Sequence, residues 1–203
     1  MFSRCRFGRL SRVGFGAAVV LLVACAAAAQ PTHSQTGDSQ LDRLNDGYSL
    51  LYGDVSGLAN ADKIFLVKFE NDATQKVVTE TADTMGKLTG QLERVARDYP
   101  SIRLDLKPLP EIERETQAAA TTARIKSFAP VVGRSGADFE RTLLLTLSGG
   151  LNQLRHLARV MAEAERSDER SALLRGAENR LDALYAEIEQ VLEDHYFAPA
   201  SSS

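Results

Sequence analysis

Glu113, Glu140 and His156 are the side chains whose types could combine to hold a metal ion. Helical bundles bind pairs of iron atoms through inward-facing glutamates and a Glu-x-x-His on each of two helices. This chain contains no Glu-x-x-His. We therefore interpret the three residues as polar flanks of helices and expect no cofactor. A metal centre built from them is the alternative.

Two short motifs look like catalytic sites but lack the parts that catalysis needs. The stretch LSGGLNQLRHLARVMA, residues 147–162, resembles the signature of ABC-transporter ATPases, although Leu151 stands where that signature has glutamine. The phosphate-binding G-x-x-x-x-G-K-[ST] loop is missing from the sequence. The stretch GRSGA, residues 133–137, is not the G-x-S-x-G turn of serine hydrolases. We expect no nucleotide to bind and interpret the first motif as a helix and the second as a turn.

The two cysteines, Cys5 and Cys25, lie at the start of the chain, within a segment typical of export signals. Residues 1–12 carry four arginines and no acid, and an apolar run of twelve residues follows, Val13–Ala24. This pattern indicates a secretory signal peptide over residues 1–24. The run is shorter than the ~20 residues that a membrane-spanning helix needs. Cleavage before Cys25 leaves a single thiol, so no disulfide can form within the mature chain.

Leu22-Val23-Ala24-Cys25 resembles the bacterial lipobox. The resemblance implies a diacylglyceryl group on the Cys25 sulfur, cleavage before that residue and acylation of the new amino group. Several acyl chains together anchor a protein stably. Ala26 follows in place of the aspartate of inner-membrane lipoproteins, which favours the outer membrane in an organism with two. The alternative is cleavage after Ala29, which releases a soluble exported protein.

The charge of the chain restricts its partners. It has 24 basic and 27 acidic residues, and loss of the four arginines of the signal changes the net charge from −3 to −7. An acidic protein has no electrostatic footprint for nucleic acid and no charge-based affinity for anionic headgroups. The expected partners are the membrane, through a lipid on Cys25, and an envelope protein or apolar ligand.

Residues 25–40 are small and polar and predict a flexible tether, residues 41–198 a helical domain, and residues 199–203 a disordered tail. Asp72 and Gln75 have the form of a capping box. Apolar residues spaced by three and four predict a short helical segment after residue 41 and long helices over about 72–98 and 110–128. Two more long helices are predicted by apolar stripes from Phe139 to Met161, with Asp138 as a candidate cap, and from Leu174 to Val191, after a short turn at Ser167-Asp168. Whether residues 60–70 are helical or extended is left open.

These elements predict an all-α fold: an up-and-down four-helix bundle with an additional short N-terminal helical segment. The exported part loosely resembles the ferritin-like helical bundles of uncharacterised bacterial exported proteins, in architecture only. We expect a cell-envelope lipoprotein that acts as a non-catalytic binding or interaction module. The alternatives are a ferritin-like metal-binding protein or enzyme, and a soluble periplasmic helical protein cleaved near Ala29.

Overall fold

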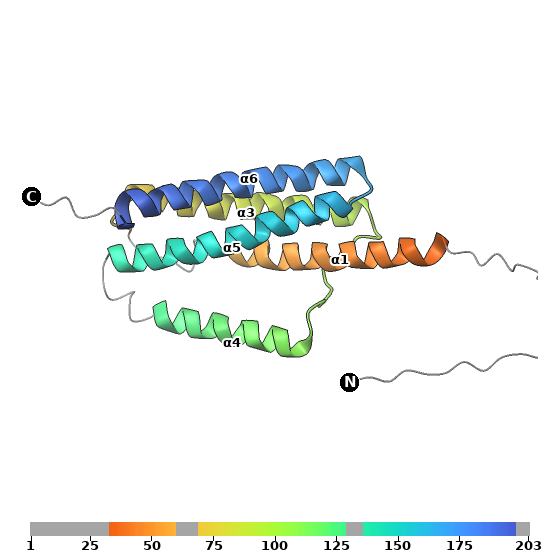
Figure 1. Cartoon of the computed structure of the whole chain (residues 1–203), viewed down its shortest axis with the longest axis horizontal. Helices are drawn as coiled ribbons and strands as arrows, with labels where there is room; N and C mark the ends of the chain where they lie inside the picture. Colours follow the sequence, from red (N-terminus) through yellow and green to blue (C-terminus); the bar gives the residue numbers. More distant parts are fainter. Residues whose placement is uncertain (1–32, 60–68, 129–135, 198–203) are drawn as a thin grey trace, which may run out of the picture. The chain divides into compact units, whose positions relative to one another are not determined.

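The structure is a computed structural model that describes residues 33–59, 69–128 and 136–197. Its elements are α1 (His33–Leu58), α3 (Asp72–Asp98), α4 (Glu111–Phe128), α5 (Ala137–Ala164), α6 (Asp168–Leu192) and a π-helical turn, η1 (Glu193–Phe197) (Figure 1). These residues contain no strand, which confirms the all-α class. Within the same ranges, no helix is both long enough and apolar enough to cross a membrane. The signal, Cys25, residues 60–68 and the tail lie outside the described residues.

Four of the helices form a bundle around one hydrophobic core. Helices α1 and α6 each contact α3 and α5, and the most extensive contact is between α5 and α6 (Figure 1). The apolar stripes predicted on three helices are buried, because residues spaced by three and four share one face of a helix. They are Val78, Ala82, Met85, Leu88, Leu92 and Val95 on α3; Phe139, Leu143, Leu147, Leu151, Leu154, Ala158 and Met161 on α5; and Leu174, Ala177, Leu181, Leu184 and Ile188 on α6. Val191, also predicted on the inner face of α6, is only half-buried.

Hydrogen bonds at the helix ends show that neighbouring helices run in opposite directions. Gln40, early in α1, donates to the carbonyl of Ala164 at the end of α5 (2.6 Å). Tyr99, just after α3, donates to Glu169 in the first turn of α6 (2.5 Å). At the opposite end, Tyr196, after α6, bonds to side chains in the first turns of α3 and α5.

Helix α1 occupies the place in the core that the sequence assigns to residues 110–128. Tyr48, Leu51 and Val55 of α1 are fully buried. The prediction of only a short helical segment after residue 41 is therefore wrong. Helix α1 has 26 residues and begins at His33, inside the predicted tether. In α4 the described side chains, residues 111–123, are exposed apart from a half-buried Arg114. Its alanines and threonines offer little apolar area to bury.

The N-cap of α3 differs from the prediction, and the N-cap of α5 is a glycine. The N-cap of α3 is Asn71, whose side-chain oxygen accepts from the amides of Ala73 (2.8 Å) and Thr74 (3.1 Å), so Asp72 lies one residue inside the helix. The N-cap of α5 is Gly136, with φ of 92°. A β-carbon on Gly136 would lie 2.1 Å from a carboxylate oxygen of Glu70. Glycine is therefore favoured here by the backbone conformation, and any larger residue would also displace the Glu70 carboxylate.

Residues 99–110 form the connector between α3 and α4. Two polar side chains of α1, one helical turn apart, hold this connector in place. The amide of Asn45 donates to the carbonyl of Ser101 (3.1 Å) and accepts from the N–H of Arg103 (2.9 Å). Ser49 donates to the carbonyl of Arg103 and accepts from the N–H of Leu106, both at 3.1 Å. The connector therefore satisfies its backbone groups on the surface of α1 rather than through a regular element of its own.

Candidate functional site

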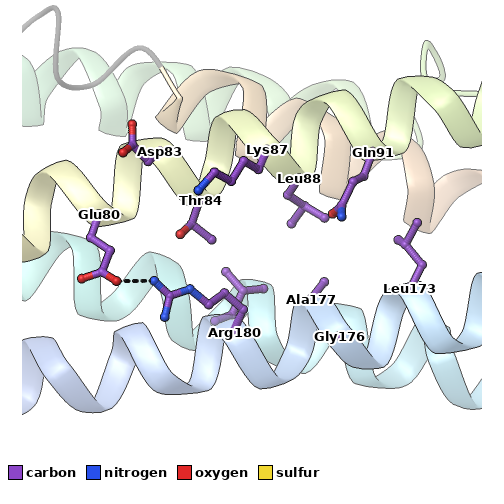
Figure 2. A pocket seen from close by; sticks show the side chains of 11 residues that line it. Glu80, Asp83, Thr84, Lys87, Leu88, Gln91, Leu173, Gly176, Ala177 and Arg180 are labelled. Carbon is purple, nitrogen blue, oxygen red and sulfur yellow. Dashed lines mark hydrogen bonds and ion pairs between the residues drawn. The ribbon is translucent and has the colours of Figure 1, made fainter.

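A groove between α3 and α6 has a volume of about 560 Å³. We call it the α3–α6 groove (Figure 2). Helix α3 supplies one wall and helix α6 the other. The groove is lined by Glu80, Asp83, Thr84, Lys87, Leu88, Gln91, Leu173, Gly176, Ala177, Arg180 and Leu181.

The groove exists because α6 carries small residues where it faces α3. Gly176 has no side chain, and a β-carbon built on it would meet nothing within 4 Å. Ala177 is buried beside it, while Leu88 and Leu181 form an apolar floor that is 4% and 0% exposed. Larger side chains at residues 176 and 177 would fill this space, as the leucines between α5 and α6 do.

One end of the groove is closed by an ion pair between its two walls. Arg180 of α6 donates to a carboxylate oxygen of Glu80 of α3 at 2.5 Å (Figure 2). The hydrogen bond from Arg180 lowers the pKa of Glu80 below its usual value. Both side chains are between a third and a half exposed, so the pair adds little to stability. Its main consequence is that each of the two charges already has a partner.

Lys87 is the other cation of the groove, and it forms no ion pair within the described residues. Its side chain extends along α3 towards Thr84, whereas the carboxylate of Asp83 points away from α6 (Figure 2). Beside its apolar floor, the groove lining therefore carries the Thr84 hydroxyl and two exposed charged side chains, Asp83 and Lys87, neither of which forms an ion pair with another described residue. None of the lining residues is a histidine, cysteine or serine.

Separate from the groove, a buried glutamate joins three parts of the bundle at the α5–α6 corner. Glu165 has a fully buried side chain and accepts from Tyr48 (3.0 Å), the backbone N–H of Ser167 (3.1 Å) and both Nε (2.9 Å) and Nη2 (2.7 Å) of Arg170. Burial alone would raise its pKa, but the hydrogen bonds from Arg170, Ser167 and Tyr48 outweigh it and lower the pKa to about 2. The corner is a structural network with every acceptor satisfied.

A second buried glutamate closes the other end of the bundle. Glu140 is 2% exposed and accepts from the N–H of Glu70 (2.5 Å) and the hydroxyl of Tyr196 (2.5 Å). The Tyr196 hydroxyl in turn accepts from Thr74 (2.8 Å), since its own hydrogen goes to Glu140. Burial, followed by the bond to Glu140, raises the pKa of Tyr196 to about 12. Glu140 therefore has a structural role.

The structure does not bring the three predicted metal candidates together. Glu140 and His156 are 16 residues apart on one straight helix, a separation of about 24 Å at 1.5 Å per residue. His156 contacts Arg159, and Glu113 of α4 accepts from Gln117 (3.3 Å). Among the described residues, no three histidine, cysteine or acidic side chains are grouped so that they could hold a metal ion.

The glycine pair of the LSGG stretch, Gly149 and Gly150, lies inside α5. The helix runs unbroken from Ala137 to Ala164. A β-carbon on either glycine would meet nothing within 4 Å, so no neighbour approaches closely there. A neighbour does approach closely at Gly47 of α1, where an added β-carbon would lie 3.0 Å from the Met161 side chain of α5.

Sequence reasoning did not identify the α3–α6 groove. The signal in the sequence is the small pair formed by exposed Gly176 and buried Ala177 on α6, but a small pair reveals a groove only when the opposite helix is known. No protein-family model, curated protein or solved structure matches this chain. The interpretation of the groove therefore rests on its own residues.

Proposed function

We propose that the chain is a lipid-anchored, non-catalytic binding module of the bacterial cell envelope that holds its ligand in the α3–α6 groove. The observation that carries the proposal is the groove itself. Its volume of about 560 Å³ falls within the roughly 300–1,000 Å³ of ligand pockets. Six of its eleven lining residues are charged or polar, so the groove is more polar than most such pockets, but it has an apolar floor formed by Leu88 and Leu181.

The buried charged groups of the bundle have partners away from the groove. Glu165 and Glu140 accept hydrogen bonds at the two ends of the bundle. This leaves Lys87 and Thr84 facing the groove without a part in those networks (Figure 2). The antiparallel contacts of α1, α3, α5 and α6 support an up-and-down bundle with α1 as its first helix, which gives the groove two long, straight walls.

The anchor in this proposal is a lipid on Cys25, and its sequence support is Leu22-Val23-Ala24-Cys25. The intact mass of the mature protein, extracted from native membranes and denatured, tests it. We expect residues 25–203 plus a diacylglyceryl group, with or without an amide-linked acyl chain, and we expect Cys25→Ser to lose the modification. An unmodified chain beginning at Gln30 would instead support a soluble periplasmic protein. In bacteria with two membranes, we propose the outer one as the site of anchoring.

Occupancy of the groove can be tested by cysteine labelling, because the mature chain has no cysteine other than Cys25. Thr84→Cys places a thiol inside the groove, and Ala172→Cys places one on an exposed position of α6 that does not line it. Relative to Ala172→Cys, we expect a maleimide to label Thr84→Cys more slowly in intact envelopes than in purified, ligand-free protein. Equal relative rates in the two preparations would refute a bound ligand.

A further inference from the structure

We draw no further inference here: the strongest candidate, the exposed face of helix α4 that begins with Ile112, carries no proposal because nothing in the described part of the chain shows what covers it.

Discussion

The hydrogen bonds of Glu165 predict a large and pH-dependent effect of Glu165→Gln on stability. Its pKa falls from 4.5 to about 2 on folding. At about 1.4 kcal/mol per pKa unit, this corresponds to roughly 3 kcal/mol of folding free energy at pH 7. Glutamine keeps one acceptor but leaves the Arg170 guanidinium, whose side chain is only 16% exposed, without a counter-charge. We expect Glu165→Gln to destabilise the protein by about 3 kcal/mol, the range for breaking a buried pair.

The direction of the pH dependence follows from the lowered pKa. The unfolded state binds a proton more readily than the folded state, so this contribution is fully present above about pH 5 and is lost as the pH falls through 4.5 towards 2. At pH 3 about 1.4 kcal/mol of it is left. The difference between wild type and Glu165→Gln should therefore shrink by more than half between pH 7 and pH 3.

Urea denaturation at pH 7 and pH 3 measures both effects. Glu163→Gln is the matched control, because Glu163 is exposed in the last turn of α5, two residues before Glu165. It should change the free energy of unfolding by no more than about 0.5 kcal/mol at either pH. The reasoning is refuted if Glu165→Gln costs no more than Glu163→Gln at pH 7, or if its cost is the same at pH 3.

Three further predictions concern other parts of the bundle. Gly149→Ala should raise the free energy of unfolding by about 1 kcal/mol, since the added β-carbon has open space. Gly47→Ala should not raise it, because the Met161 side chain must move to make room. Equal gains for the two variants in urea denaturation would contradict the α1–α5 contact. Tyr196→Phe should lower the free energy of unfolding by roughly 1–2 kcal/mol because Glu140 loses a donor while remaining buried, and an unchanged urea midpoint would argue against that network. In hydrogen-exchange mass spectrometry, amides of α4 should exchange faster than those of α6, because exposed helices open readily; comparable protection would mean that α4 is packed.

The fold class and three of the core helices followed from the sequence because their determinants are local. Leucines at spacings of three and four on α5 and α6 define one apolar face, whatever the rest of the chain does. Helix α1 was harder to recognise. Its inner face includes Asn45, Gly47 and Ser49, which interrupt the apolar pattern. These residues are explained only by what lies against them, the connector after α3 and the Met161 side chain.

The sequence wrongly placed the helix over 110–128 in the core of the bundle, and this error has a different cause. Pro110, the acids of the first turn and Pro130 correctly indicated a helix over 110–128, because helix limits depend on nearby residues. Whether that helix joins the core depends on how much apolar area it can bury, and the exposed Ala118 and Thr122 offer little. The α3–α6 groove was not foreseen for a related reason: it is formed by the register between two helices that are about 90 residues apart in the chain.

Ligand binding in the α3–α6 groove is tested most directly by native mass spectrometry of the protein released gently from its membrane. Gly176→Leu fills the groove, while Gly149→Leu makes the same change on the exposed surface of α5. We expect wild type and Gly149→Leu to carry one non-covalent ligand of the same mass, and Gly176→Leu to carry none while remaining folded. A ligand retained equally by both variants would contradict the assignment of the groove as the binding site.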